Sequence, residues 1–432
     1  MKICIVGAGV VGSYLAKKLS EEGYDIAIID KDSKKIENLQ MHADIAAYSC
    51  DAFDEECIGQ LKDYDLYIVA TNKDEINLSV ALMLRAVYNR DRIFVRVDKD
   101  ILSKHEIESF LQIEIVNTFK EIYKNVETII DYPFISYLNE LEEGKFIILS
   151  YRAKRPDRFT NTKIADLKDL REKVPFTLAI IERDEKIFIP KGEKTILEGD
   201  LLYILIERDR LDEFIDLSNI QFTPVKDVVF LGVSQVGRSI LKRLYEEKKL
   251  KIKVIEEDIQ LCEEIASEFS GIMVLNGKIT DQELLKSERI GDTDLVVSAS
   301  YKEDNILACI IAKKLNARKV LAVIEKPEYE EIAFSLGIDM PIVARKLIAR
   351  KVYRKIRHRG LRDIFELKEN VRVYEQTADK KFSGKRISEM PLKNSVVLSV
   401  VRDGKMNIVQ GNFVLKEGDI LIILEKENGE NE

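Results

Sequence analysis

The chain has 432 residues, of which 46% are hydrophobic and 33% are charged, and its net charge is −8. This composition predicts a soluble globular protein of about two to four domains, and the acidic balance gives no reason to expect nucleic acid as a partner. No run of about eighteen apolar residues occurs, so we expect no membrane-spanning helix. The five cysteines form no CxxC pair and have no histidine at metal-ligand spacing, so we expect reduced thiols.

An internal repeat in the order A–B–A′–B′ organises the sequence. A glycine-containing segment near the N-terminus recurs near the middle of the chain, and a segment with a Gly-Asp turn recurs near the C-terminus. We pair residues 2–12 with 227–237, 64–70 with 292–298 and 92–98 with 319–325, and we find similar runs within 178–204 and 398–424. The repeat predicts four domains with the boundaries 1–134, 135–218, 225–360 and 361–432.

In the first A unit, short apolar runs alternate with amphipathic stretches of helical periodicity. Strands are expected at 3–6, 26–29, 45–48, 66–70 and 93–97, and helices at 12–22, 76–88 and 119–130. This alternation predicts the α/β class, with a doubly wound, parallel, Rossmann-like sheet in each A unit. Each B unit is expected to be a small α+β domain, in which the tetrapeptides at 183–186 and 402–405 form hairpin turns.

The strongest chemical signal is a GxGxxG motif, Gly7-Ala8-Gly9-Val10-Val11-Gly12, between a strand and a helix. Such a turn lets backbone amides approach a pyrophosphate at the N-terminus of the helix. Asp30 ends the next strand and can accept hydrogen bonds from ribose hydroxyls, while its charge repels a 2′-phosphate. With Lys31 as the nearest cation along the chain, NAD(H) or an adenine nucleotide is favoured over NADP. The alternative is a tight turn that binds no ligand.

Further candidate ligand-binding residues follow the third, fourth and fifth strands. Asp51 comes after the third strand, Thr71 and Asn72 come after the fourth, and Arg96 could pair with a phosphate from the fifth. The alternative for each residue is a structural role as a turn former, a helix cap or a surface ion pair. Asp74 is interpreted as a helix cap, because it directly precedes a helical run.

The second A unit retains Gly232 and Gly237 but has Ser234 at the position of the middle glycine. Glu256 replaces the aspartate and keeps the carboxylate, whereas Val323 stands in the position of the arginine. These changes predict either a weaker, altered nucleotide site or an empty structural copy.

Nothing in the sequence groups catalytic residues around the expected nucleotide. The histidines are His42, His105 and His358, and neither B unit contains a histidine or a cysteine. A catalytic role is therefore not expected.

Residues 345–359 are rich in lysine and arginine with an interleaved apolar stripe. We interpret this run as an amphipathic dimerisation helix with a solvated basic face, and contact with anionic lipid or an acidic partner is the alternative.

The architecture resembles the TrkA family of bacterial and archaeal potassium-uptake regulators, which are built from repeated RCK (KTN) domains. The resemblance covers essentially the whole chain. It is carried by the tandem order, residues 7–12 with Asp30, the runs 71–77, 131–133 and 281–285, and the two Gly-Asp hairpins.

The resemblance implies a cytosolic subunit that lies on the inner face of the membrane. Such subunits form a homo-oligomeric RCK ring, a dimer or tetramer, beneath a Trk-type potassium-translocating protein. NAD(H) or ATP/ADP would bind at Gly7, Gly9, Gly12, Asp30, Asp51, Thr71 and Arg96. Ligand-driven changes in the ring would then gate transport without chemistry on the nucleotide. Two alternatives remain open from the sequence, namely a soluble NAD-dependent oxidoreductase and an RCK regulator of another ion channel or antiporter.

Overall fold

The chain divides into two compact units, each of which combines two repeated domains. One unit contains Met1–Val126 and Lys226–Val352, and the other contains Glu127–Val225 and Tyr353–Glu432. The structure, a computed structural model, describes residues 1–21, 23–60, 63–141, 144–184, 186–300, 304–356, 361–368, 371–390, 395–409 and 411–426. The A domains thus pair with each other in the first unit, and the B domains pair in the second.

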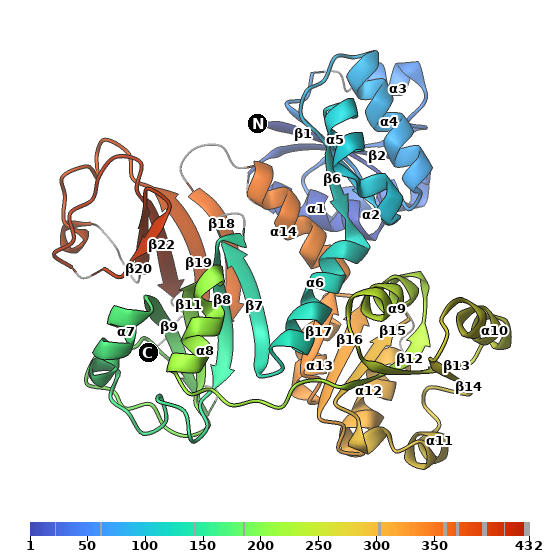
Figure 1. The fold of residues 1–432 in the computed structure, drawn as a ribbon. Helices are drawn as coiled ribbons and strands as arrows, with labels where there is room; N and C mark the ends of the chain where they lie inside the picture. Colours follow the sequence, from blue (N-terminus) through green and yellow to red (C-terminus); the bar gives the residue numbers. More distant parts are fainter. Residues whose placement is uncertain are drawn as a thin grey trace. The chain divides into compact units, whose positions relative to one another are not determined.

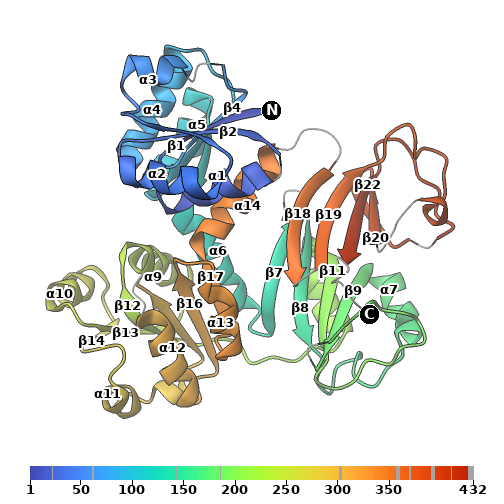
Figure 2. The same ribbon diagram turned by 180° about the vertical axis from the view of Figure 1, so that it is seen from behind.

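The first Rossmann domain is a parallel sheet with the strand order β3-β2-β1-β4-β5-β6. Helices lie on both faces of this sheet (Figures 1 and 2). Its elements are β1 (Lys2–Val6), α1 (Val10–Glu21), β2 (Asp25–Asp30), α2 (Ser33–His42), β3 (Ala46–Ser49), α3 (Glu55–Gln60), β4 (Leu66–Val69), α4 (Asp74–Ala86), β5 (Ile93–Val97), α5 (His105–Leu111), β6 (Glu114–Asn117) and α6 (Thr118–Asp131).

The chain order places the candidate site at a reversal in the sheet. After β1 the chain winds outward through β2 and β3, and it then returns to the other side of β1 with β4. The loops that leave β1 and β4 therefore diverge, and in open α/β sheets ligands bind at the carboxyl ends of the strands at such a point. Val11, Leu15 and Leu19 of α1 are buried at helical spacing, so the helix after the glycine loop is held firmly on the sheet.

The second Rossmann domain repeats this topology with the order β14-β13-β12-β15-β16-β17. Its elements are β12 (Asp227–Val233), α9 (Gln235–Glu247), β13 (Lys251–Glu256), α10 (Ile259–Glu268), β14 (Met273–Asn276), α11 (Gln282–Ser287), β15 (Leu295–Ala299), α12 (Asp304–Lys314), β16 (Lys319–Ile324), α13 (Tyr329–Ser335), β17 (Met340–Val343) and α14 (Ala344–Ile356).

One of the predicted repeat pairings is wrong by one residue. Lys2 donates its backbone N–H to Asp65 Oδ2 at 2.8 Å, and its counterpart Asp227 donates to Asp294 Oδ2 at 3.3 Å. Asp65 therefore corresponds to Asp294, not to Thr293 as the pairing of 64–70 with 292–298 implied. An extra residue in a surface loop moves the register without disturbing the buried strands that follow.

Each small domain contains an antiparallel five-stranded sheet, with the orders β10-β9-β11-β8-β7 and β18-β19-β22-β20-β21. The first consists of β7 (Ile135–Leu141), β8 (Phe146–Arg152), α7 (Lys168–Lys173), β9 (Phe176–Arg183), β10 (Lys186–Phe188), β11 (Leu201–Glu207) and α8 (Leu211–Leu217). The second contains β18 (Leu361–Lys368), β19 (Val371–Thr377), β20 (Ser395–Arg402), β21 (Lys405–Asn407) and β22 (Ile420–Lys426). The predicted fold class is confirmed. Glu185, in the first predicted hairpin turn, lies outside the described residues.

The repeated Gly-Asp turns of the small domains are explained by a buried ion pair. Gly199 adopts φ +91°, which places Asp200 directly before β11 with its side chain 1% exposed. Arg183 donates to both oxygens of Asp200, at 2.6 and 2.7 Å, and the backbone N–H of Leu197 donates at 2.8 Å. Arg402 pairs with Asp419 in the same way, at 2.8 and 2.7 Å. The bidentate pair thus fixes the turn that precedes the last strand of each domain.

The two small domains share a hydrophobic core in addition to the core that each has of its own. Residues of both sheets form this core, including Phe146, Ile180 and Leu205 from the first and Leu398 and Ile422 from the second. The hydroxyl of Thr177 also donates to the carbonyl of Leu398 at 3.0 Å, which links β9 to β20. The B repeats therefore form an intramolecular pair.

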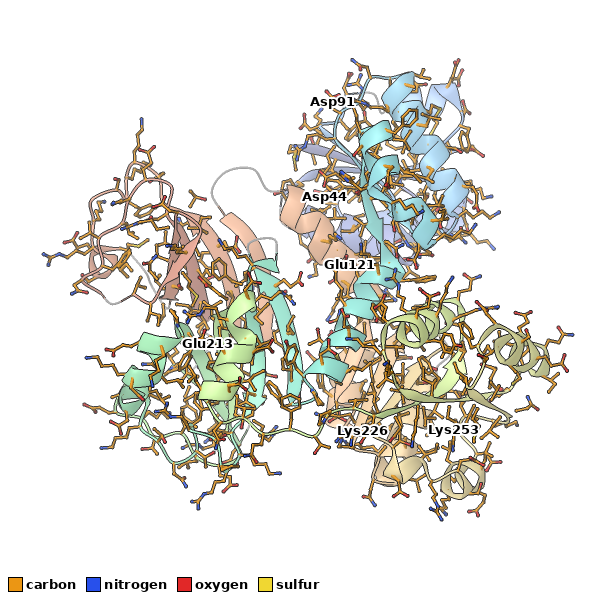
Figure 3. The ribbon with its side chains drawn as sticks, viewed as in Figure 1. Asp44, Asp91, Glu121, Glu213, Lys226 and Lys253 are labelled. Atoms are coloured by element: carbon orange, nitrogen blue, oxygen red, sulfur yellow. A yellow bond between two sulfur atoms is a disulfide. The ribbon has the colours of Figure 1, made fainter. Side chains whose placement is uncertain are left out.

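The Rossmann domains are joined through α6, α9 and α14. The hydroxyl of Tyr123 donates to Glu247 at 2.5 Å, and Arg243 pairs with Asp100 at 2.7 Å. Lys351 of α14 pairs with Glu121 of α6, labelled in Figure 3, at 2.6 Å.

The described part of the basic run is partly neutralised within its own unit. Arg345 donates to the carbonyl of Glu325, and Lys346 pairs with Glu330. Lys346 is thus paired with a carboxylate of its own unit, and Arg345 is bonded to a backbone carbonyl. His358 and the rest of the run beyond 356 lie outside the described residues. Across the described ranges, no helix is long and apolar enough to cross a membrane.

The buried pair in the first small domain predicts a large loss of stability on removal of its carboxylate. Asp200→Ala leaves Arg183 and the N–H of Leu197 without their acceptor, so we expect the free energy of unfolding to fall by about 3 kcal/mol. Urea unfolding followed by circular dichroism measures this change. Ala at the exposed neighbour Glu198 is the matched control, with an expected change within about 0.5 kcal/mol. Equal effects of the two substitutions would contradict the assignment.

The same pairs predict acid sensitivity. Burial alone would raise the pKa of Asp200 and Asp419, but hydrogen bonds from Arg183, Arg402 and the backbone hold both pKa values below normal. A lowered folded-state pKa stabilises the fold above the unfolded-state pKa of about 4, and this stabilisation is lost as pH falls through the folded-state pKa. Urea midpoints measured from pH 7 to 3 should therefore fall more for wild type than for Asp200→Ala. Parallel curves would refute this.

Candidate functional site

The glycine loop after β1 is built so that two of its glycines cannot be replaced and one faces open space. Gly7 has φ +104°, and a Cβ there would lie 2.9 Å from the backbone nitrogen of Thr71. A Cβ on Gly12 would lie 1.9 Å from the carbonyl oxygen of Gly7. A Cβ on Gly9 meets nothing within 4 Å. Gly7 serves the turn and Gly12 serves helix packing, while Gly9 leaves the face of the loop clear.

Asp30 is aimed at this loop from the end of β2. Its Oδ2 accepts the backbone N–H of Ala8 at 2.7 Å, and its Oδ1 accepts the N–H of Asp32 at 2.9 Å. The side chain is 13% exposed, and Lys35 Nζ lies 4.0 Å from Oδ2. Asp30 therefore lies beside the glycine loop, as the motif predicts. Lys35, one turn into α2, was missed because it lies beyond the motif.

The other candidate residues of the first domain differ in how far their side chains are exposed. Val10 is 42% exposed, whereas Val11 is buried against the sheet. Lys31 is exposed at the start of the loop after β2. Asp51 is also exposed, and its Oδ1 accepts the N–H of Phe53 at 2.9 Å. Asp51 thus forms an Asx turn, which leaves its second carboxylate oxygen available to another donor.

A buried asparagine that was not among the candidate ligand-binding residues organises the edge of the sheet. Asn77 of α4 is 0% exposed, and its Oδ1 accepts the N–H and hydroxyl of Thr71 at 2.9 and 2.5 Å. Its Nδ2 donates to the carbonyls of Thr71 and Arg96 at 3.1 and 2.9 Å. Asn77 therefore holds the ends of β4 and β5 together. Thr71 and Arg96 meet here, while Asn72 lies exposed in the same loop.

Arg96 is engaged in an ion pair in this structure. Its guanidinium donates to both oxygens of Asp98, at 3.2 and 3.0 Å, and to the hydroxyl of Thr118 at 3.1 Å.

The helix-cap interpretation of Asp74 is wrong. Asp74 lies inside α4, and its carboxylate accepts the N–H groups of Asp98 and Lys99 at 3.0 and 2.9 Å. It anchors the loop after β5, because that loop passes directly over the start of the helix.

The second Rossmann domain closes the equivalent region more tightly. Glu256 is 7% exposed, and its Oε2 accepts the N–H of Val233 at 2.7 Å. Its Oε1 accepts two more backbone N–H groups, from Glu257 and Asp258, at 2.8 and 3.0 Å. The hydroxyl of Ser234 donates to the carbonyl of Ala299 at 2.6 Å. Both replacements thus make internal hydrogen bonds.

The glycines of the second copy keep their packing role. A Cβ on Gly237 would lie 2.9 Å from the carbonyl oxygen of Ala299, and Gly232 adopts φ +77°. Asn305 is the counterpart of Asn77, and its Nδ2 donates to the carbonyls of Ser300 and Val323 at 3.2 Å. The position of Arg96 is therefore occupied by Val323, as the repeat predicts.

The expectation that all five cysteines are reduced is wrong. Cys50 and Cys57 form a disulfide, because the loop that follows β3 turns back and brings the two residues together. Cys4, Cys262 and Cys309 are buried free thiols. The sequence offers no CxxC pattern that would signal the bond, since the two cysteines are seven positions apart.

The described histidines are not gathered at the candidate site. His42 lies in α2, where its Nδ1 is 2.7 Å from the carbonyl of Asn38, and His105 is 88% exposed at the start of α5. Among the residues described, no group of three or more His, Cys, Asp or Glu side chains could hold a metal ion.

Comparison with protein families finds both repeated parts of the chain. A model of the TrkA-N domain matches residues 3–115 and 228–344, and a model of the TrkA-C domain matches residues 148–219 and 371–432. The first matches the two Rossmann domains, and the second matches the two small domains.

Curated relatives are similar over nearly the whole chain. The "Trk system potassium uptake protein TrkA homolog 1" of Methanosarcina mazei is 24% identical over 438 residues, spanning 98% of this chain and 97% of the relative. The "Trk system potassium uptake protein TrkA homolog" of Archaeoglobus fulgidus is 25% identical and spans 99% and 97%. The "Trk system potassium uptake protein TrkA" of Halomonas elongata is 23% identical and spans 99% and 96%.

Solved structures show the same fold. The crystal structure of the GsuK RCK domain has a TM-score of 0.62 at 15% sequence identity, and covers 98% of this chain and 92% of that chain. The GsuK channel bound to NAD has a TM-score of 0.64 at 15% identity and covers 98% and 76%.

The glycine loop yields a matched pair of substitutions. Gly12→Ala forces a methyl group against the carbonyl of Gly7, so we expect a loss of stability of about 2 kcal/mol or more. Gly9→Ala meets no neighbour and should change stability by no more than about 0.5 kcal/mol. Thermal unfolding of both variants without ligand measures the difference. Similar destabilisation by both would show that the loop packs differently.

Proposed function

The chain belongs to the TrkA family, and we propose that it is the regulatory subunit of a Trk-type potassium-uptake system that senses NAD(H) or ATP/ADP. The near-complete coverage of the named relatives in both directions supports this assignment. The repeated TrkA-N and TrkA-C matches support the same domain plan.

The observation that best supports a nucleotide site is that Gly9, which has open space in front of it, lies in a loop held by the carboxylate of Asp30. A substituent at Gly9 meets nothing within 4 Å, while Asp30 holds the loop through the N–H of Ala8 at 2.7 Å. A pyrophosphate would accept backbone N–H groups of this loop at the N-terminus of α1, and Asp30 would accept from ribose hydroxyls. The GsuK channel bound to NAD, which has a similar fold, supports this interpretation.

The negative charge of Asp30 favours a nucleotide without a 2′-phosphate. The carboxylate repels such a group, and Lys35 Nζ, 4.0 Å away, is partly neutralised by Asp30 and by Asp32 at 3.9 Å. NAD(H) and the adenine nucleotides share the ribose and phosphates that this loop would hold.

The arrangement around Arg96 supplies a route by which ligand alters the first unit. A phosphate that paired with Arg96 would compete with Asp98, and the segment after β5 would respond. The N–H groups of Asp98 and Lys99 are held by Asp74, and Asp100 pairs with Arg243 of α9 at 2.7 Å. Binding would thereby favour one arrangement of the two Rossmann domains, which is sufficient for regulation.

The second Rossmann domain acts mainly as a structural partner in this proposal. Glu256 is satisfied by three backbone N–H groups, and Ser234 is bonded to Ala299. A nucleotide would have to displace these bonds and would find Val323 in place of Arg96.

The proposed assembly is a homo-oligomeric RCK ring, a dimer or tetramer, in the cytoplasm. It would lie on the inner face of the membrane, against a potassium-translocating protein. Ligand-driven change in the ring would alter the gate of that protein, and the nucleotide would serve as a signal rather than as a substrate.

Removing the carboxylate of Asp30 tests the site. Asp30→Ala loses a charged hydrogen-bond acceptor, so we expect affinity for NAD, NADH, ADP or ATP to fall by about tenfold or more. Isothermal titration of the full chain measures this loss. Glu256→Ala, the matched change in the second domain, should leave the tightest site within about twofold. Unchanged affinity in Asp30→Ala would refute the ribose role, and turnover of NADH with a metabolite would refute the non-catalytic role.

A further inference from the structure

We propose that Cys50 and Cys57 form a redox-modification site, at which a low-molecular-weight thiol–disulfide couple opens and closes the loop beside the first nucleotide site. Closure is proposed to strengthen nucleotide binding, and this part of the inference rests on the proposed function. The formation and reduction of the bond do not depend on it.

The disulfide lies next to the residue that the proposed site depends on most. Cys50 directly follows β3, and its backbone N–H donates to the carbonyl of Asp30 at 3.1 Å. The carboxylate of Asp30 in turn holds the N–H of Ala8 in the glycine loop at 2.7 Å. Cys57, in α3, is 6% exposed and belongs to the core of the domain. The bond therefore ties the loop that carries Asp51 to the core at one end and to Asp30 at the other.

The second Rossmann domain closes the equivalent loop without sulfur. The N–H of Gly277 donates to the carbonyl of Glu256 at 2.9 Å, so Gly277 occupies the position of Cys50. The N–H of Glu56 donates to Asp54 and that of Glu283 to Asp281, each at 3.0 Å. This register aligns α3 with α11.

Leu284 consequently stands at the position of Cys57 in the second copy. Its Cδ2 lies 2.4 Å from the site that a Cβ on Gly277 would take, so the leucine packs directly over the glycine. The same two positions are thus joined by a covalent bond in one domain and by apolar packing in the other. Packing of this kind is insensitive to reductant, whereas the disulfide is not.

The loop between the cysteines has mainly local support. Asp51 accepts the N–H of Phe53 at 2.9 Å, and its carbonyl accepts the N–H of Asp54 at 3.0 Å. Phe53 at the middle of the loop is 50% exposed. Opening the bond restores conformational freedom to this segment. A ligand that needs Asp51 in place must then order the loop on binding, which lowers its affinity.

The other cysteines are poor competitors for this chemistry. Burial raises the pKa of Cys4 and Cys309 to about 12, and burial is also the main reason that the pKa of Cys262 is raised. Their thiolate fractions at neutral pH are therefore small, and exchange requires the thiolate. Exchange is thus directed to the Cys50–Cys57 pair, of which Cys50 is the more exposed member.

Reduction balances as a two-electron exchange. A small thiolate attacks Sγ of Cys50, a mixed disulfide forms, and Sγ of Cys57 leaves as a thiolate that takes up a proton. A second small thiolate attacks the outer sulfur of the mixed disulfide, which releases the oxidised small disulfide and the Cys50 thiolate. Oxidation reverses these steps and consumes one small disulfide. In a reducing compartment, disulfides of this kind are usually transient and redox-sensing.

The experiment equilibrates the full chain in glutathione buffers from fully reduced to fully oxidised. Alkylation and peptide mass measurement should show Cys50 and Cys57 changing together as one reversible couple. Hydrogen exchange over residues 46–60 should become faster on reduction. NADH affinity, measured by titration at both extremes, should be lower in the reduced protein by about fivefold or more.

Two double variants provide the matched controls. Cys50→Ser with Cys57→Ser cannot form the bond and should bind NADH like the reduced protein in every buffer. Cys50→Gly with Cys57→Leu installs the pair found in the second domain, and should bind like the oxidised protein in every buffer.

Several results would overturn the proposal. If Cys50 and Cys57 remain thiols at the oxidising extreme, or remain bonded at the reducing extreme, there is no redox site. If the couple titrates but hydrogen exchange and NADH affinity do not change, the bond does not control the loop. If neither redox state binds any nucleotide, the proposed function fails and the affinity claim with it, while the thiol titration still decides the redox site.

Discussion

The interaction on which the first unit depends is the hydrogen bond from the glycine loop to an acidic side chain at the end of the neighbouring strand. Both Rossmann domains make it, from Ala8 to Asp30 and from Val233 to Glu256, each at 2.7 Å. The bond fixes the loop at the carboxyl ends of the strands, because a carboxylate is a strong acceptor and the loop N–H would otherwise lack a partner. Asp30 accepts one further backbone N–H, from Asp32 at 2.9 Å, whereas the longer glutamate accepts two, from Glu257 and Asp258, at 2.8 and 3.0 Å. A ligand that took over the carboxylate would therefore have to replace one more hydrogen bond in the second domain than in the first.

The second constraint is that each domain pairs with its own repeat. The two Rossmann domains contact each other, and so do the two small domains. The Rossmann domains are joined by polar contacts such as Tyr123 with Glu247 and Lys351 with Glu121. The small domains share a hydrophobic core that both sheets build. Both pairs thus form within the chain, between its own two copies of each domain.

Much of this organisation could be predicted from the sequence, because periodicity and glycine spacing report directly on buried strands and tight turns. The fold class, the position of Asp30 beside its loop and the replacement of Arg96 by Val323 all follow from such local patterns. Side-chain partners do not, because they depend on loops that converge only in space. Asp74 holds a loop that begins after β5, Arg96 finds Asp98, and Asn77 joins two strand ends. Cys50 and Cys57 are likewise brought together by a loop, and composition had suggested the opposite. A one-residue change in loop length also sufficed to misplace the pairing of Asp65.

The shared core of the small domains has an evolutionary consequence. Thr177 donates its hydroxyl to the carbonyl of Leu398 at 3.0 Å, but Val396, which takes the place of Thr177 in the repeat, has no hydroxyl with which to return the bond. Two identical chains meeting on a twofold axis would present every side chain twice, so each substitution would be tested simultaneously on both sides. Fusion of the two copies removes that restriction. Each half of the interface is free to diverge while the other compensates, and the two Rossmann domains carried by the same chain inherit this freedom to specialise.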